Sequence, residues 1–299
     1  MSTGDFKGKQ FKETEVADKV VEQYDLAHAR IFYKYVMGGG GMDIHYGAFR
    51  SASDGVFESS KETNKRLLTT LDWMRPITEK SLVLDLGSGH GGLSHELIKT
   101  YGCKVIGVNI SPEQNKMNEE EAKRLGVGDK NEVVLANFND GLPADWTGKF
   151  THVVSCEVFC HAASKPGLLA DLKRCLAPGG ALAFTDIMGA DGANEKALKD
   201  FTDRNATTEM ARPSNYRQML KDVGYREVSF LDMSAHLVLY FDNMVKQINT
   251  HKADMMKEGV SEEYLAKWLD SLTQRVDIQR EHEVFAWGVF ACRTDGPLF

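Results

Sequence analysis

The sequence predicts an α/β protein with a doubly wound, mostly parallel seven-stranded sheet and helices on both faces. Short apolar runs alternate with helical segments from residue 82 onward, which is typical of a parallel sheet covered on both sides. A glycine-rich turn directly follows the first of these runs. The first 80 residues instead have helical periodicity, so we expect an N-terminal helical cap (1–80) before the sheet domain (81–299).

Composition and charge limit the classes of partner. The chain has 299 residues, of which 42% are hydrophobic and 26% charged, as is usual for a globular protein. Lys and Arg number 36 and Asp and Glu 43, which gives a net charge of −7. Nucleic-acid binding relies on clustered positive charge, so we expect a small-molecule partner and no nucleic acid.

Targeting and metal signals are weak. No apolar run approaches the roughly 18 residues of a membrane helix, and Met1–Gln10 lacks the apolar centre of a signal peptide. Cys156, Cys160 and His161 lie close together, but no second cysteine pair or spaced histidine pair completes a zinc pattern. We therefore expect a cytoplasmic protein, a monomer or homodimer, with reduced cysteines, no metal and no membrane association.

Two helices are predicted in the cap. Apolar residues recur at helical spacing over Glu15–Met37, and the pattern ends at the four glycines of Gly38–Gly41. A second helix is expected over Ser59–Met74.

The sheet is predicted from five apolar runs and two later ones. The five runs are Leu82–Leu86, Val105–Val108, Glu132–Ala136, Thr151–Ser155 and Ala181–Asp186. The late strands are expected at Arg226–Leu231 and Val284–Cys292.

Helices are predicted between these strands. One covers His95–Tyr101, and the next begins at Ser111 as N-cap, with Pro112 in the first turn and Gln114 at N3. Another covers Lys165–Leu176 and is expected to stop at Pro178-Gly179-Gly180. The late helices, within insertions near 190–222 and 236–281, are Asn194–Thr208, Asn215–Val223 (with Gly224 as C-terminal cap), Val238–Met256 and Glu262–Arg280.

The turn after the first strand carries the strongest chemical signal. Gly87, Gly89 and Gly92 satisfy G-x-G-x-x-G, the pattern of dinucleotide sites, and lead into a helix N-terminus. Asp85, however, stands two residues before the first glycine. A carboxylate there would repel a pyrophosphate, but it suits the ammonium group of a methionine moiety. The turn therefore favours S-adenosylmethionine over a nicotinamide dinucleotide.

This turn, together with Leu176–Gly180 before the fifth strand, resembles the class I S-adenosylmethionine-dependent methyltransferases, whose fold is Rossmann-like. The resemblance implies that Asn109 binds the ribose hydroxyls and that Phe138 contacts the adenine. Gln114 as a capping residue only, and Phe138 as a core residue only, remain open alternatives. The implied cofactor-binding residues are Asp85, Gly87, Gly89, Asn109, Gln114, Asn137, Phe138 and Cys156.

The segment after the fourth strand, Cys156–His161, is expected at the edge of the sheet where the cofactor binds. Glu157 and His161 resemble the acidic residue and the histidine of phosphoethanolamine and sarcosine/dimethylglycine methyltransferases. The resemblance implies that Glu157 attracts a cationic amine and that His161 takes its proton or polarises it. Structural roles for both residues remain the alternative.

The N-terminal segment narrows the resemblance. Gln23-Tyr24 and Gly40–Gly47 are similar to the same segment of sarcosine/dimethylglycine methyltransferases, as are Asn115–Glu120 and Trp287-Gly288. The similarity implies a catalytic Tyr24, an aromatic lining for a methylated ammonium and an arginine for a carboxylate. The implied substrate-binding residues are His45, Tyr46, Phe159, Arg217 and Trp287, with ordinary core aromatics and an exposed helix arginine as the alternatives.

Sequence and resemblance together predict N-methylation of sarcosine or dimethylglycine towards betaine. Cys156-Glu157 departs from the more usual pair of a polar residue and Asp, which leaves the acceptor open. S-methylation of a methylthio-acid and N-methylation of phosphoethanolamine are the alternatives within the enzyme class. A non-catalytic S-adenosylmethionine-binding protein and a nicotinamide oxidoreductase are the alternatives outside it.

Overall fold

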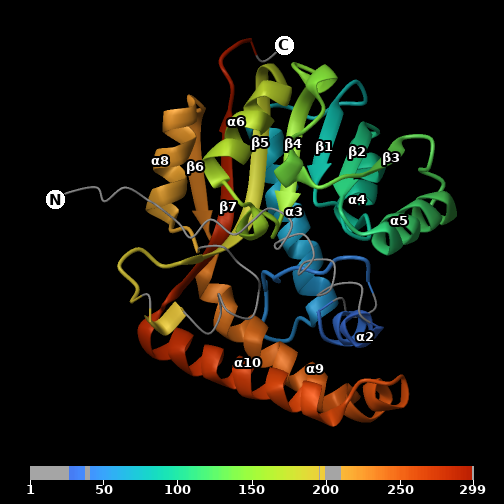
Figure 1. The fold of residues 1–299 in the computed structure, drawn as a ribbon, viewed down its shortest axis with the longest axis vertical. Helices are drawn as coiled ribbons and strands as arrows, with labels where there is room; N and C mark the ends of the chain where they lie inside the picture. The colour runs from blue at the N-terminus through green and yellow to red at the C-terminus, as the bar shows by residue number, and fades with distance from the viewer. Residues whose placement is uncertain (1–26, 38–40, 195, 199–209, 298–299) are drawn as a thin grey trace.

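The computed structural model describes residues 27–37, 41–194, 196–198 and 210–297. Within them, one sheet has the strand order β3-β2-β1-β4-β5-β7-β6 (Figure 1). The strands are β1 (Leu82–Leu86), β2 (Lys104–Asn109), β3 (Asn131–Leu135), β4 (Phe150–Cys156), β5 (Leu176–Gly189), β6 (Arg226–Asp232) and β7 (Phe285–Arg293). Strands β1 to β5 run parallel, and β7 is antiparallel to both β5 and β6. The predicted Rossmann-like, mostly parallel seven-stranded sheet is confirmed.

Helices cover both faces of this sheet, because its strands bury side chains on both sides. Val83 and Val105 belong to one core, with helices α3, α4 and α9, whereas Leu84 and Ile106 belong to a second core with α6 and α8. The helices are α2 (Ala27–Val36), α3 (Val56–Met74), α4 (Gly92–Tyr101), α5 (Pro112–Arg124), α6 (Lys165–Cys175), α8 (Pro213–Val223), α9 (Leu237–Lys257) and α10 (Glu262–His282). None of these described helices combines the length and the apolar character that crossing a membrane requires.

The connections reverse direction between β1 and β4. Strands β2 and β3 extend the sheet on one side of this pair, and β5, β7 and β6 extend it on the other. In sheets of this kind, ligands bind outside the carboxyl ends of the strands at such a reversal. The long hairpin of α9 and α10 lies across the same end of the sheet, at the bottom of Figure 1.

Several boundaries differ from the prediction. Strand β5 begins at Leu176, before Pro178, because Leu176 already pairs with Phe150 of β4 across an irregularity that accommodates the proline. Helix α4 begins at Gly92 and α3 at Val56, each three residues before the predicted start. Most of the predicted helix Asn194–Thr208, and the predicted helix Glu15–Met37 before residue 27, lie outside the described residues.

Candidate functional site

The glycine-rich turn joins β1 to α4 in a conformation that requires glycine. Gly87 has a φ of 75°, and a Cβ atom there would lie 2.3 Å from the Cγ2 atom of Val158. At Gly89 the same addition would meet nothing closer than 4.0 Å. The turn is therefore packed against the segment after β4 on one side and open on the other.

A cavity lies on the open side, at the carboxyl ends of the parallel strands. All eight residues predicted to bind the cofactor line it: Asp85, Gly87, Gly89, Asn109, Gln114, Asn137, Phe138 and Cys156. Asp43, His45, Glu157 and His161 line the same cavity. Among the described residues, no group of three or more His, Cys, Asp or Glu side chains is arranged to hold a metal ion.

The ends of β1 and β2 place two polar side chains in this wall. Asp85 is 1% exposed, accepts a hydrogen bond from Ser94 Oγ at 2.6 Å, and has a pKa that burial raises to about 6. Asn109 donates its Nδ2 to Gln114 Oε1 at 3.0 Å, which leaves its Oδ1 atom to accept from a ligand. The backbone N–H of Gln114 donates to the N-cap Ser111, so Gln114 takes part in the cap and also orients Asn109.

Glu157 follows β4 with a strained backbone, since its φ of 59° lies in the left-handed region. Its Oε1 atom accepts a hydrogen bond from Trp287 Nε1 at 2.5 Å. Its Oε2 atom is shielded from solvent and has no hydrogen-bond partner among the described residues. Burial and the nearby Asp186 raise the pKa of Glu157 to about 7. Glu157 therefore changes charge near neutral pH.

His161 and Phe159 share the short 3₁₀ turn Phe159–His161 but have different environments. His161 lines the cavity, and burial together with the positive charge of Lys165 lowers its pKa to about 4. Phe159 stacks on Phe184 with ring centroids 4.1 Å apart and is fully buried. The prediction that Phe159 binds substrate is not supported, because its ring belongs to the core.

Four aromatic side chains meet beside Glu157, and we call them the aromatic cluster: Tyr46, Tyr240, Phe241 and Trp287. Their contacts are edge-on, with the Tyr46 ring 5.1 Å from Tyr240 and 6.0 Å from Trp287. Tyr240 also donates its hydroxyl to the carbonyl of His45 at 3.0 Å. The predicted pair Tyr46 and Trp287 is thus brought together, but neither ring lines the cavity, and Trp287 is as fully buried as Phe159. Tyr24 lies outside the described residues.

Two arginines differ in their relation to this cluster. Arg217 is exposed on α8, with its guanidinium 5.3 Å from the ring centroid of Phe230, and it does not line the cavity. Arg275, on α10, is only 7% exposed and lies 5.8 Å from the ring centroid of Trp268. Burial raises the pKa of Tyr46, and the positive charge of Arg275 opposes this rise. The positive charge that acts on Tyr46 is therefore that of Arg275, whereas Arg217, the predicted ligand of a carboxylate, does not line the cavity.

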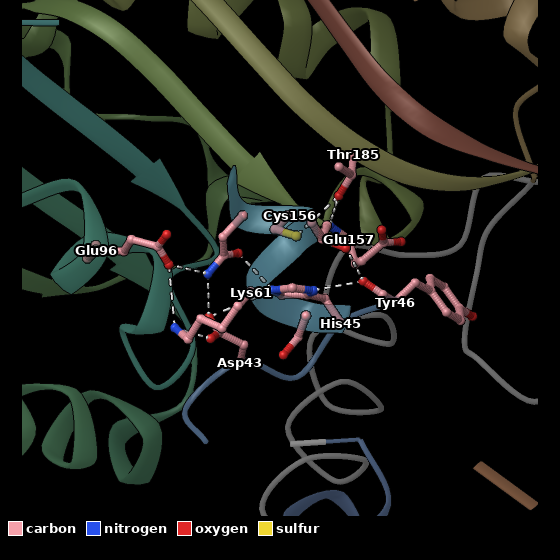
Figure 2. A network of polar contacts seen from close by, with 12 residues as sticks. Asp43, His45, Tyr46, Lys61, Glu96, Cys156, Glu157 and Thr185 are labelled. Carbon is pink, nitrogen blue, oxygen red and sulfur yellow. Dashed lines mark hydrogen bonds and ion pairs between the residues drawn. The ribbon is translucent and has the colours of Figure 1, made fainter. Parts of the chain in front are cut away.

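The loop of residues 41–55 is tied to α3 and α4 by a network of hydrogen bonds and ion pairs (Figure 2). Asp43 and His45 come from the loop, Lys61 and Asn64 from α3, and Glu96 from α4. No sequence motif identifies Lys61, Asn64 or Glu96. Lys61 and Asn64 lie on α3 and Glu96 lies on α4, so only the packing of the two helices brings them together. For Arg275 a signal exists, since Ser271, Arg275 and Gln279 recur every four residues on the buried face of α10.

Comparison with known proteins places these features in a family. The sequence matches the family described as mycolic acid cyclopropane synthetase over residues 11–284. A sarcosine/dimethylglycine N-methyltransferase from Halorhodospira halochloris is 31% identical over 284 residues, covering 94% of this chain and 99% of the relative. A dimethylglycine N-methyltransferase from Parasynechococcus marenigrum is 29% identical, covering 94% and 97% of the two chains.

Solved structures agree on the fold. The crystal structure of a putative sarcosine dimethylglycine methyltransferase from Galdieria sulphuraria aligns with a TM-score of 0.80 at 25% identity, covering 89% of this chain and 98% of the other. A phosphoethanolamine N-methyltransferase from Haemonchus contortus, solved with S-adenosylhomocysteine, aligns with a TM-score of 0.77 at 15% identity. It covers 95% of this chain and 60% of the other, and it supports the fold alone.

Proposed function

This chain belongs to the mycolic acid cyclopropane synthetase family, and we propose that it methylates the amine of sarcosine or dimethylglycine to form betaine. It is an S-adenosylmethionine-dependent methyltransferase. The acceptor is suggested by the sarcosine/dimethylglycine N-methyltransferases that are similar over nearly the whole chain. The structural observation that carries the proposal is the Oε2 atom of Glu157, a shielded carboxylate oxygen without a partner among the described residues.

The cavity suits the cofactor at both of its ends. We assign the methionine ammonium to Asp85, whose carboxylate lies at the end of β1 beside the glycine-rich turn. Asn109 Oδ1 would accept from a ribose hydroxyl, and Phe138 would lie against the adenine. When bound, S-adenosylmethionine supplies an electrophilic methyl group on sulfur.

Glu157 has the properties of both an ammonium ligand and a proton acceptor. A protonated amine has no lone pair, so it must lose a proton before the N–C bond forms and the C–S bond breaks. We assign this proton to Glu157, because a pKa of about 7 suits proton exchange near neutral pH. His161 is a weaker base, because its pKa is lowered to about 4, and we assign it a neutral hydrogen-bonding role.

The acceptor's carboxylate requires a cation on the far side of the amine. We assign it to Arg275, which is buried outside the lining of the cavity and whose positive charge opposes the rise in the pKa of the Tyr46 hydroxyl. A guanidinium binds a carboxylate through two parallel hydrogen bonds, which fixes its orientation as well as its charge. The Tyr46 and Trp287 rings would then enclose the methylated nitrogen between Glu157 and Arg275.

An endpoint assay tests the acceptor directly. The protein is incubated with S-adenosylmethionine and glycine, sarcosine, dimethylglycine, phosphoethanolamine or a methylthio-acid, and products are identified by mass spectrometry. Betaine from dimethylglycine is the expected result. A sulfonium product or methylated phosphoethanolamine as the main product would overturn the acceptor assignment. Binding of S-adenosylmethionine without turnover on any acceptor would contradict N-methylation altogether.

A further inference from the structure

His45 is a buried histidine whose two ring nitrogens both face acceptors. Its side chain belongs to the 41–55 loop and lines the cavity, and the residue is 5% exposed. Nε2 lies 2.9 Å from Asn64 Oδ1, and Nδ1 lies 3.0 Å from the carbonyl oxygen of Tyr46 (Figure 2). A carbonyl oxygen accepts only, so Nδ1 carries a hydrogen.

The orientation of Asn64 decides the other nitrogen. The amide nitrogen of Asn64 lies 3.0 Å from Asp43 Oδ1 and 3.1 Å from Glu96 Oε2. Lys61 forms ion pairs with the same two carboxylates, at 2.7 Å and 3.4 Å. Turning the amide over would set its oxygen against two carboxylates, so the oxygen must face His45. Nε2 therefore also carries a hydrogen, and the ring is an imidazolium.

From this geometry we propose that His45 is a positioning residue that remains protonated and keeps two cavity carboxylates, Asp85 and Glu157, ionised for the cationic groups they bind. The part that concerns Glu157 rests on the proposed function; the part that concerns Asp85 rests only on the cofactor. Both N–H groups of His45 are already used within the protein. His45, which the resemblance implies to be a substrate-binding residue, therefore acts through its charge and has no N–H left to donate to the acceptor.

The electrostatics of the cavity agree with this role. Burial opposes the charge of His45, but the nearby Cys156 and the Asp43 carboxylate, 3.7 Å from Nε2, hold its pKa well above the usual value. Because burial also raises the pKa of the Cys156 thiol, the Asp43 carboxylate is the negative charge that acts near neutral pH. The pKa of Asp85 and that of Glu157 are raised by burial, and the charge of His45 opposes both rises. The other titratable or charged groups that face these three residues are Tyr46, Lys61, Cys160, Asp186, Tyr216 and Tyr240.

The protonation state is measured without any turnover. Full-length protein labelled with ¹⁵N in its histidines, with S-adenosylhomocysteine bound, is studied by long-range ¹H–¹⁵N NMR at about pH 8, above the ordinary histidine pKa of about 6.5. We expect one ring with both nitrogens protonated, whose signals are absent from the His45→Gln variant. A neutral His45 at this pH would overturn the proposal. This measurement is independent of the acceptor, so a wrong acceptor cannot produce the same result.

The functional consequence is a displaced pH dependence. Without the imidazolium, the carboxyl pKa values rise, so activity and cofactor binding need a higher pH. In His45→Gln we expect the acidic limb of kcat/KM for dimethylglycine to move upward by about one pH unit. The pH dependence of S-adenosylhomocysteine affinity, measured by calorimetry, should move in the same direction.

Two further variants separate charge from folding. Asn64→Leu removes the acceptor at Nε2 and leaves every charged side chain in place, so it should shift both pH dependences in the same direction but less. His282→Gln changes an exposed histidine at the end of α10 and should shift neither. If a folded His45→Gln protein, checked by circular dichroism, keeps both wild-type pH dependences, the electrostatic role is wrong.

Discussion

The two halves of the cavity wall are built in different ways. The cofactor half, with residues 85–92, 109–114 and 137–138, consists of turns that directly follow β1, β2 and β3. The half that we assign to the acceptor is assembled from segments far apart in the chain. His45 and Glu157 line the cavity, whereas Trp287, which donates to Glu157, and Arg275 are buried and do not line it. Glu157 and its donor Trp287 are 130 positions apart, and Tyr240 and the His45 carbonyl are 195 apart.

The halves also differ in the chemistry that they use. The cofactor half depends on backbone shape at Gly87 and Gly89 and on short-range hydrogen bonds such as that between Asn109 and Gln114. The acceptor half depends on charges shielded from water, which are costly unless other charges compensate them. This difference teaches that local sequence builds the part of the wall assigned to the cofactor, whereas the part that we assign to the acceptor depends on the tertiary arrangement of charges.

The largest effect is expected at Glu157. Glu157→Gln keeps the size of the side chain and an oxygen for Trp287 Nε1, but it loses the charge and the proton acceptor. We expect kcat/KM for dimethylglycine to fall by about 10³-fold, with S-adenosylhomocysteine affinity within about twofold of wild type. In the wild type, kcat/KM should fall as pH drops below about 7, because the ionised form is required. A variant with nearly full activity would show that the acceptor half works without this carboxylate.

Asp85→Asn should weaken cofactor binding much more than it lowers kcat, which is the reverse of the effects expected for Glu157→Gln. Replacing the carboxylate weakens a charge-assisted hydrogen bond to an ammonium group, so the Kd of the cofactor should rise by about 10- to 100-fold. At saturating cofactor, kcat should change much less. Calorimetry and steady-state kinetics measure the two quantities separately. A larger effect on the KM of the acceptor than on cofactor affinity would contradict the division into halves.

The two arginines form a matched pair for the carboxylate assignment. Arg275→Leu should raise the KM for dimethylglycine by about 10-fold, whereas exposed Arg217→Leu should change it by less than about twofold. Dimethylethanolamine, which lacks the carboxylate, is the second control. If Arg275→Leu raises the KM for dimethylethanolamine and the KM for dimethylglycine equally, the arginine contributes to the packing of α10 and does not bind the carboxylate.

The smallest effect is expected at Trp287. Trp287→Phe removes the hydrogen bond to Glu157 Oε1, which stabilises the ionised carboxylate, so the acidic limb of kcat/KM should move upward by about one unit. At about pH 8 most of the activity should remain. Trp146→Phe, in the core on the other face of the sheet, is the matched control. Trp146→Phe should lower the free energy of unfolding without moving the acidic limb of kcat/KM. An equal shift of this limb in both variants would contradict the role of Trp287.

All eight residues predicted to bind the cofactor line one cavity, for a physical reason. Gly87 requires glycine, Gly89 has a left-handed φ that favours it, Ser111 caps α5, and Asp85 lies near the end of an apolar strand, so each property is visible within a few residues. The strands were equally visible as apolar runs. Boundaries were less accurate where tertiary pairing overrides a local signal, as at Pro178, which lies inside β5.

The acceptor half was predicted only in part. Resemblance selected Glu157, Tyr46 and Trp287, but not Arg275. The recurrence of Ser271, Arg275 and Gln279 every four residues indicates a buried helix face, but it assigns no role to the arginine. Arg217 shows the converse, since its position in the sequence does not reveal that it faces solvent on α8. Asn64 and Glu96 become significant only when α3 and α4 are packed against the 41–55 loop.

The close approach of Val158 to Gly87 has a consequence for anyone redesigning this enzyme. The Val158 side chain occupies the space that a Cβ atom on Gly87 would need, so the turn after β4 packs directly against the turn after β1. Libraries that randomise residues near 158 to change acceptor preference would disturb the cofactor at the same time. Under the proposed role of Arg275, diversity placed on the buried face of α10 around this residue would avoid the contact between Val158 and Gly87.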